Sequence, residues 1–383
     1  MRFDLPEDIV SLREMVRRYA AERIRPNSRA WDRDQWVPDE AMAEMAELGL
    51  FGLLTPEEYG GSKHPEHGYL ANAVVLEEIA RQDGGVALLL AAHNGLCQAH
   101  LNIAASVEQK RKYLPKLASG EWMGAWALTE PGSGSDAAAL TTRAERDGDG
   151  WRLTGNKMFI TNGARAHVFV IVARTDPQKG AKGISAFIVE RGAAGFNIGP
   201  KEDKLGVRAS DTVPLDLDGV YVDADALVGE PGMGYINALQ VLERGRVGIG
   251  AMAVGLGRGC LEESIAYANQ RVAFGKPIAA QQAIQFMLAD MATEIDAARL
   301  LVHDAAQKLD RGEDARHAAS LAKLFASERA TQVGLKAIQI HGGYGYTKDM
   351  PVERLMRDAK LCEIGEGSSE VQRILIARHV LGK

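Results

Sequence analysis

The spacing of apolar residues in the first third of the chain predicts α-helices. Two runs repeat at intervals of three and four residues, the spacing of one helix face: Ile9, Leu12, Val16 and Tyr19, and then Met42, Met45, Ala46 and Leu48 before Gly49. We therefore expect a helical N-terminal domain over residues 1–120.

The pattern changes after about residue 120. Short runs rich in β-branched and aromatic residues alternate with clusters of Gly, Pro, Asp and Asn, and the clearest runs are 168–173, 184–189 and 213–217. A β domain is therefore expected over residues 121–230. Helical patterns with few prolines return over residues 231–383, as in the stripe formed by Ile284, Met287, Leu288, Met291 and Ile295. We expect this third domain to be a helix bundle.

One segment combines an acidic residue, a glycine-rich turn and the start of an amphipathic helix: Glu363-Ile-Gly-Glu-Gly-Ser-Ser-Glu-Val-Gln-Arg373. Val371, Ile374 and Leu375 share one helix face, and Ser368 or Ser369 suits the N-cap. The free N–H groups at such a helix end suit an anion. Glu366 is therefore a candidate general base, although a charged loop before an ordinary capped helix would show the same pattern.

Composition narrows the class of protein. With 383 residues, 46% of them hydrophobic and 25% charged, the chain is long enough for two or three globular domains. The formal net charge of −6, with basic residues interspersed among acidic ones, argues against nucleic acid as a partner. No run of 18 apolar residues occurs, and residues 1–6 lack the apolar core of a signal peptide. We expect a cytoplasmic protein without a membrane partner.

Three other patterns in the chain do not indicate a site. Cys97, Cys260 and Cys362 are far apart and form no CxxC pair, so we expect buried thiols and no metal site. Residues 248–253 fit a loose GxGxxA dinucleotide motif, but no strand precedes them, and close helix packing explains the small residues. His341-Gly-Gly343 is similar to an esterase oxyanion loop, yet the chain has no G-x-S-x-G elbow.

Two further segments are Trp126-Ala-Leu-Thr-Glu-Pro-Gly-Ser-Gly-Ser-Asp136 and Gly155-Asn-Lys-Met-Phe-Ile-Thr-Asn-Gly163. Together with the Glu366 segment they resemble the acyl-CoA dehydrogenase family. More blocks match in the same order along the chain: 242–246, 270–275, 281–284, 339–343 and 355–360. The resemblance implies an N-terminal helical domain, a middle β-barrel and a C-terminal four-helix bundle, usually assembled as a tetramer that is a dimer of dimers.

The resemblance also implies a reaction. FAD would oxidise an acyl-CoA thioester to the trans-2-enoyl-CoA, with Glu366 removing the α-proton and flavin N5 accepting the β-hydride, since no protein side chain can accept hydride. Burial by the acyl chain would raise the pKa of the Glu366 carboxyl toward that of the activated α-carbon. The Glu366 N–H and a ribityl hydroxyl would hold the thioester carbonyl. Electrons would then pass to an electron-transfer flavoprotein.

Residue by residue, the match assigns contacts with FAD. Leu128 and Thr129 match positions at the flavin ring, Thr161 a hydroxyl near N5, and Phe159 stands where the family commonly has Trp. Without the match, Phe159 and Ile160 would both be interpreted as β-core residues. Five residues match positions that bind the ADP portion of FAD across a dimer interface: Arg271, Phe274, Gln282, Gln339 and Gly343. Ser368 and Glu370 match FAD-contacting positions that follow the base.

The match assigns substrate contacts as well. Ser135 matches a position near the pyrophosphate and the CoA arm, and Gly367 lies beside the thioester. Glu243 and Arg246 align with a pair that touches CoA, although their i,i+3 spacing would also suit a simple ion pair. Some members carry the base on this helix instead, where this chain has Gly245.

The residue before the base is commonly Tyr in straight-chain enzymes and is Gly365 here. That favours a short, branched or cyclic acyl group, unless Tyr344 or Tyr346 refills the space. Two alternatives remain open: an acyl-CoA oxidase, which is typically a longer chain, and a non-catalytic flavoprotein on the same fold.

Overall fold

The computed structural model describes residues 4–382. Its N-terminal part is helical, as the apolar spacing predicts, and Ile9 and Val16 are buried on one face of the first helix. The longer helices are α1 (Glu7–Tyr19), α2 (Ser28–Asp34), α3 (Asp39–Glu47), α4 (Gly68–Ala80), α5 (Gly84–Ala92), α6 (Ala99–Ala104) and α7 (Val107–Ala118). A capping box begins α7, because Ser106 Oγ accepts from the Gln109 N–H and Gln109 Oε1 accepts from the Ser106 N–H.

Strands follow, and all but a small hairpin belong to one sheet with the order β6-β7-β3-β2-β4-β5-β8, in which β1 pairs with β4. They are β1 (Gly124–Ala127), β2 (Arg143–Asp147), β3 (Gly150–Thr161), β4 (Val168–Arg174), β5 (Ile184–Glu190), β6 (Phe196–Ile198), β7 (Thr212–Val222) and β8 (Leu227–Val228). Phe169 of β4 and Phe196 of β6 are separated by three strands in this order, yet their ring centroids lie 4.8 Å apart. The sheet therefore curls around its own core as a barrel.

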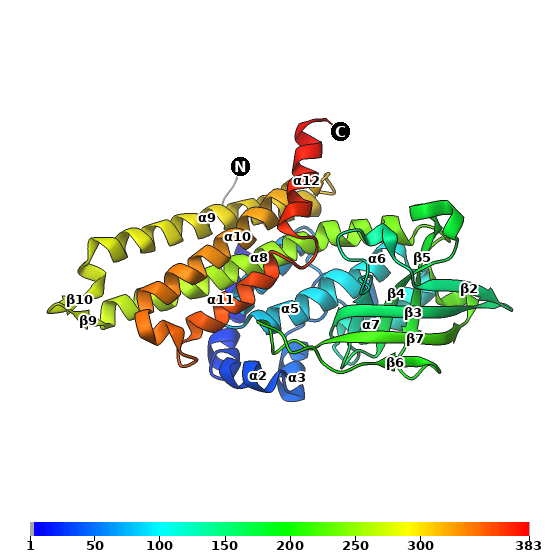
Figure 1. Ribbon diagram of the computed structural model, residues 1–383, viewed down its shortest axis with the longest axis horizontal. Coiled ribbons are helices and arrows are strands. Elements are labelled where there is room, and N and C mark those ends of the chain that lie inside the picture. The colour runs from blue at the N-terminus through cyan, green and yellow to red at the C-terminus, as the bar shows by residue number, and fades with distance from the viewer. Residues whose placement is uncertain (1–3, 383) are drawn as a thin grey trace.

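The C-terminal part is again helical. It consists of α8 (Gly234–Gln270), the hairpin β9 (Val272–Ala273) and β10 (Lys276–Pro277), α9 (Gln282–Asp310), α10 (Arg316–His341), α11 (Pro351–Cys362) and α12 (Ser369–Val380). Figure 1 shows the β domain at one end of the long axis and the β9–β10 hairpin at the other, with α8 running between them. The three-domain architecture expected from the sequence is confirmed. No helix within residues 4–382 is both long and apolar enough to cross a membrane.

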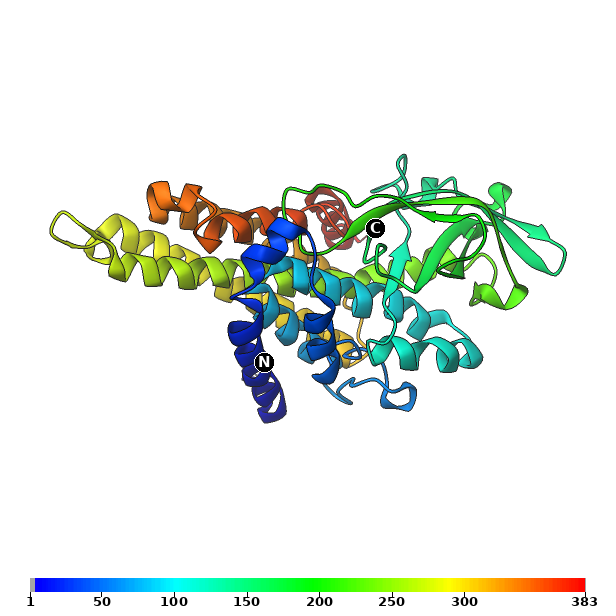
Figure 2. The same cartoon turned by 90° about the horizontal axis from the view of Figure 1, so that it is seen from below.

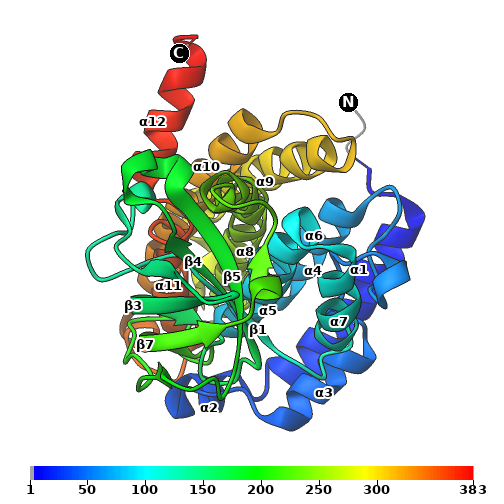
Figure 3. The same ribbon diagram turned by 90° about the vertical axis from the view of Figure 1, so that its right-hand side faces the viewer.

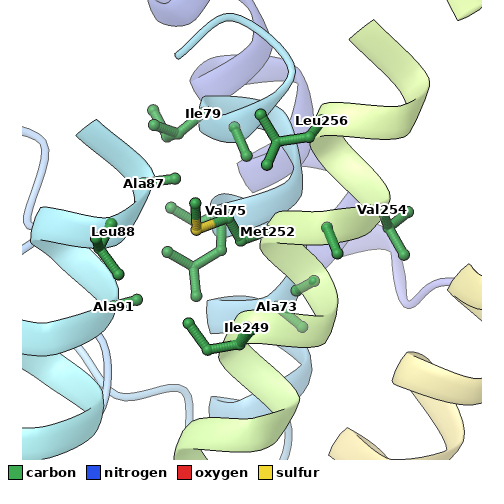
Figure 4. Close-up of a cluster of buried hydrophobic side chains, with 14 of the residues drawn as sticks. Ala73, Val75, Ile79, Ala87, Leu88, Ala91, Ile249, Met252, Val254 and Leu256 are labelled. Atoms are coloured by element: carbon green, nitrogen blue, oxygen red, sulfur yellow. The ribbon is translucent and has the colours of Figure 1, made fainter. Parts of the chain in front are cut away.

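The N-terminal and C-terminal helices share one apolar core. Figure 4 shows side chains of α4 and α5 packed against Ile249, Met252 and Leu256 of α8. A Cβ added at Gly255 would lie 2.3 Å from the carbonyl oxygen of Glu77, so glycine lets α8 approach α4 closely. Within the GxGxxA pattern, a Cβ added at Gly248 would lie 3.3 Å from a Leu76 methyl carbon and one at Gly250 would lie 3.0 Å from a Val302 methyl carbon, so these glycines serve helix packing, as the sequence predicts. All three cysteines are buried free thiols.

The β domain stands beside the N-terminal helices, and the turn that leads into α12 lies near it. Figures 2 and 3 show this from two sides, and Figure 3 shows α12 itself projecting from the body of the molecule. The position of this turn matters because it carries Glu366.

Candidate active site

Glu366 lies in the tight turn between α11 and α12. Its φ is 54° and that of Gly367 is 93°, so two successive residues adopt the left-handed conformation. That conformation is uncommon for a residue with a side chain and is typical of functional sites. Helix α12 begins at Ser369 with Ser368 at the N-cap, as predicted, but the Ser368 side chain makes no capping bond to the backbone.

The carboxylate of Glu366 points into a buried space beside α8. Its Oε2 is buried and has no hydrogen-bond partner in the described part of the chain. A Cβ added at Gly245 of α8 would lie 1.9 Å from this Oε2, so the absence of a side chain at residue 245 makes room for the carboxylate. Burial raises the pKa of Glu366 to about 7, against the opposing positive charges of Lys323 and Arg246.

Arg246, one residue further along α8, faces Glu366. It is buried, and its Nε has no partner within residues 4–382. Burial lowers its pKa, and the negative charge of Glu366 opposes this more strongly than that of Glu243 does. Among the described residues Arg246 forms no ion pair with Glu243, so the simple i,i+3 pair is not what the structure shows. Burial also raises the pKa of Glu243.

Further buried polar atoms without a partner lie at the start of α12. They are Ser369 Oγ and Gln372 Oε1, within six residues of Glu366. Buried polar groups in native proteins are rarely left without a hydrogen bond, so such a group of atoms suits a polar ligand or ordered water.

The residues predicted to contact the flavin ring come from two neighbouring segments. Leu128 and Thr129 follow β1, and Phe159 and Thr161 lie near the end of β3. The Met158 N–H donates to the Thr129 carbonyl at 2.9 Å, which ties the two segments together. Phe159 is 60% exposed with φ of 59°, at a shift in the pairing of β3 with β7. Interpreting it as a core residue was therefore wrong, because the bulge turns it outward, whereas Ile160 is buried.

A buried ion pair supports this surface. Lys157 Nζ donates to Glu130 Oε1 at 2.9 Å and to the Leu128 carbonyl at 3.0 Å. The Glu130 carboxylate also accepts from the backbone of Thr141 and Thr142. Burial lowers the pKa of Lys157 to about 8 despite its partner. Because both charges are hydrogen-bonded, the pair fixes the backbone of Leu128 from inside the barrel.

Ser135 lies in the exposed loop between β1 and β2. The loop begins with a tight turn in which the N–H of Glu130 donates to Ser133 at 2.9 Å. Nothing lies within 4 Å of a Cβ placed at Gly132 or Gly134, so this loop faces open space that a ligand can approach.

The residues predicted to contact ADP lie at the end of the molecule opposite the β domain. Arg271 and Phe274 lie at the β9–β10 hairpin, Gln282 begins α9, and Gln339 and Gly343 lie where α10 ends. The Arg271 guanidinium carbon is 5.8 Å from the centroid of the Tyr344 ring. Phe274 is 94% exposed and has φ of 53°. Figure 1 shows this hairpin at the far end of α8 from β3, so one chain does not bring the ring contacts and the ADP contacts together.

Neither tyrosine proposed to refill the space beside Gly365 lies near it. Tyr344 and Tyr346 belong to a short 3-10 helix before α11, whereas Gly365 follows the end of α11. Helix α11, which has 12 residues and is therefore about 18 Å long, lies between the two tyrosines and Gly365. The refilling hypothesis is therefore wrong within one chain. The nearest atoms that a Cβ at Gly365 would meet belong to Leu361, at 3.6 Å and beyond.

Sequence reasoning missed two buried lysines next to these segments. Lys323 is fully buried on α10 and donates to the Gly367 carbonyl at 2.7 Å. It falls on the stripe Ala319, Lys323, Ala326 and Ala330, so helical periodicity could have marked it. Lys157 likewise occupies an inward position of β3, as Leu153 does. A charged residue at a core position is the signal in both cases.

The surfaces fit FAD in two respects. A strained, exposed aromatic residue beside hydroxyl-bearing Thr129 and Thr161 suits a flat ring, and an open Gly/Ser loop suits a diphosphate arm. An exposed guanidinium at Arg271 suits a second diphosphate contact.

Three family models cover almost the whole chain. The N-terminal, middle and C-terminal domains of acyl-CoA dehydrogenase match residues 6–121, 125–220 and 232–381. An acyl-CoA dehydrogenase of Bacillus subtilis is 44% identical over 98% of both chains.

Solved structures agree with this. Butyryl-CoA dehydrogenase from Megasphaera elsdenii is 39% identical, with a TM-score of 0.97 and 100% of both chains covered. A chain in the structure reported for the electron transferring flavoprotein of Acidaminococcus fermentans is 40% identical, with the same TM-score and the same coverage. The chain therefore belongs to the acyl-CoA dehydrogenase family of FAD-dependent oxidoreductases.

Proposed function

We propose that this protein oxidises a short, branched or cyclic acyl-CoA to the trans-2-enoyl-CoA, with Glu366 as the base that removes the α-proton. The buried, unpartnered Oε2 of Glu366 carries this proposal. A pKa of about 7 lets the carboxylate exist at neutral pH while it stays basic enough to take a proton from an activated carbon. Bound FAD supplies the acceptor for the β-hydrogen as hydride.

The backbone of the same turn serves the thioester. The Glu366 N–H donates to no acceptor within the described part of the chain, and it belongs to the same left-handed turn as the carboxylate. A fixed N–H donor that meets the thioester carbonyl stabilises the negative charge which develops on that oxygen as the α-proton leaves. Arg246, Glu243, Ser135 and Gly367 are proposed to line the path of the CoA portion.

Cofactor binding is proposed to require a second subunit. Leu128, Thr129, Phe159 and Thr161 would contact the ring, with Ser368 and Glu370 beside it. The ADP portion would be held by residues at the far end of a neighbouring chain: Arg271, Phe274, Gln282, Gln339 and Gly343. The separation of the two groups within one chain supports this arrangement, and a tetramer built from two such dimers is the proposed assembly. The proposed acceptor of the electrons is an electron-transfer flavoprotein, supported by the similarity to the Acidaminococcus chain.

Gly365 supports the substrate class. Leu361 lies 3.6 Å or more from a Cβ placed there, so the wall that a larger residue would form beside the base is missing. The similarity to a butyryl-CoA dehydrogenase supports a short acyl chain.

The test is anaerobic visible spectroscopy of the FAD-loaded protein with butyryl-, hexanoyl-, isobutyryl-, 2-methylbutyryl- and cyclohexanecarboxyl-CoA. Bleaching of the flavin band by one of them is expected and identifies the acyl class. The Glu366→Gln protein should keep FAD and lose nearly all bleaching, since an amide cannot take the proton. Glu328→Gln is the matched control, because it changes a carboxylate of α10 that pairs with Arg373 of α12. Near-normal bleaching by the Glu366→Gln protein would contradict the assigned base.

A further inference from the structure

A buried lysine lies directly behind the catalytic turn. Lys323 is 0% exposed, and its Nζ donates to the Gly367 carbonyl at 2.7 Å. Burial of an ammonium group is costly, and a lysine is rarely found fully buried without a partner that needs it. Its one acceptor in the described residues is the carbonyl of the residue that follows Glu366.

The bond acts on a strained piece of backbone. Glu366 and Gly367 are both left-handed, and such a conformation persists only where the surroundings hold it. The Gly367 carbonyl accepts from Lys323 and also from Gln372 Nε2, at 2.9 Å. Gln372 is itself fully buried. Two donors from α10 and α12 therefore fix the Gly367 carbonyl, and Gln372 Nε2 also donates to the Glu366 carbonyl at 3.4 Å.

The charges around this turn come from three helices. Glu366 faces Lys323 of α10 and Arg246 of α8, and Lys323 acts on it more strongly. Lys323 in turn faces the Cys362 thiol of α11, Glu366, Arg246 and Glu363. Burial raises the pKa of Cys362 to about 12, so that thiol is neutral. Glu363 is engaged by Thr331 and by Lys360, the latter at 2.8 Å.

We propose that Lys323 is a positioning residue for the reaction: it fixes the Gly367 carbonyl in the turn that carries Glu366, and its positive charge keeps the Glu366 carboxylate ionised. The proposal rests on the base role proposed for Glu366. Burial alone favours the neutral acid, which cannot accept a proton, and a nearby positive charge offsets that preference. A hydrophobic side chain at residue 323 would fill the space equally well but would do neither task.

Two variants separate the two tasks. Lys323→Gln removes the charge and keeps an N–H donor for the Gly367 carbonyl, whereas Lys323→Met removes both. Loss of a neighbouring positive charge is expected to move the pKa of Glu366 upward by about 1 unit from about 7. The ionised fraction at pH 7 would then fall about five-fold, and the rate of flavin reduction with it.

The measurement is the rate of flavin reduction by the best acyl-CoA, followed by stopped flow as a function of pH. In both variants the rate of flavin reduction should rise with pH about 1 pH unit higher than in the parent protein. Lys323→Gln should reach the parent rate at pH 9, where Lys323, with a pKa of about 8, is neutral in the parent too. The rate of the Lys323→Met protein should stay below the parent rate at every pH, because the Gly367 carbonyl has lost one of its donors. FAD content and Tm are measured alongside.

Lys336→Met is the matched control, because Lys336 lies on the same helix and pairs with Asp290 and Glu294 of α9 instead. An unshifted pH profile in both Lys323 variants would overturn the proposal, and so would failure of both to fold while Lys336→Met folds, since Lys323 would then be structural only. If the parent protein itself is not reduced by any acyl-CoA, the proposed function fails first, so the two failures are distinguishable.

Discussion

Replacing Gly245 by alanine should disable the base while leaving the fold intact. The new Cβ would lie 1.9 Å from Glu366 Oε2 and 2.9 Å from its carboxyl carbon. Ordinary contacts of a Cβ begin at 3.4 Å, so the carboxylate oxygen must move by about 1.5 Å. A misplacement of about 1 Å at a reacting group can lower a rate about 100-fold, and we expect at least that loss in the rate of flavin reduction.

The stability of the variant should change little. Residue 245 lies inside α8 with ordinary helical geometry, where alanine is favoured over glycine by about 1 kcal/mol. That gain offsets part of the strain from the displaced Glu366 side chain. We therefore expect a Tm within a few degrees of the parent protein, together with full FAD content.

The assay is anaerobic stopped-flow reduction of the flavin at saturating acyl-CoA, with calorimetry on the same samples. Gly248→Ala is the control, since it makes the same change one turn along α8 and its Cβ would meet only a Leu76 methyl group at 3.3 Å. Undiminished flavin reduction in the Gly245→Ala protein, with Gly248→Ala behaving normally, would refute the placement of the Glu366 carboxylate over residue 245.

Three further outcomes are expected. Flavin reduction by the parent protein should rise with pH through about 7, because the Glu366 carboxyl is protonated and inactive below its raised pKa; a flat profile between pH 6 and pH 8 would contradict this. Arg271→Ala should lose FAD on gel filtration and elute at a smaller size, whereas Lys276→Ala in the same hairpin should not; equal FAD retention by both would argue against the ADP contact. Lys157→Met should lower the free energy of unfolding by about 3–5 kcal/mol, since it leaves Glu130 buried without its partner. A denaturant midpoint equal to that of the parent protein would show that the ion pair does not stabilise the fold by this amount.

The sequence predicts the order of helical and β domains because each depends on a local period. The stripe on α9 and the runs in β4, β5 and β7 all lie where the pattern places them. Glu366 could also be singled out as a candidate base, since its turn and the helix after it are contiguous in the chain. The residues that act on it could not: Gly245 and Lys323 are far from it in sequence, and only the packing of α8 and α10 against the turn brings them together.

Phe159 shows a second limit. Leu153 and Lys157 point inward on β3, so strict alternation would also turn Phe159 inward. The pairing with β7 shifts between Lys157 and Ile160, and Ile160 is buried instead. A bulge of this kind inserts a residue and turns its side chain to the other face. No local composition marks it, because the cause is the register with a strand about 50 residues further along the chain.

Besides Gly367, three of the predicted site residues have a left-handed backbone: Phe159, Phe274 and Glu366. Such strain persists where other contacts over-determine it. At Glu366 those contacts are the bonds from Lys323 and Gln372, and beside Phe159 they are the Met158–Thr129 bond and the buried Lys157.

Phe274 differs from the other two, because it is 94% exposed at the tip of a hairpin of two paired residues on each strand. Few contacts from its own chain hold it there. The proposed base and the proposed ring surface are therefore preorganised within one chain, whereas few contacts of this chain hold the hairpin proposed to bind ADP. This is the division expected if the cofactor site is completed by a second subunit.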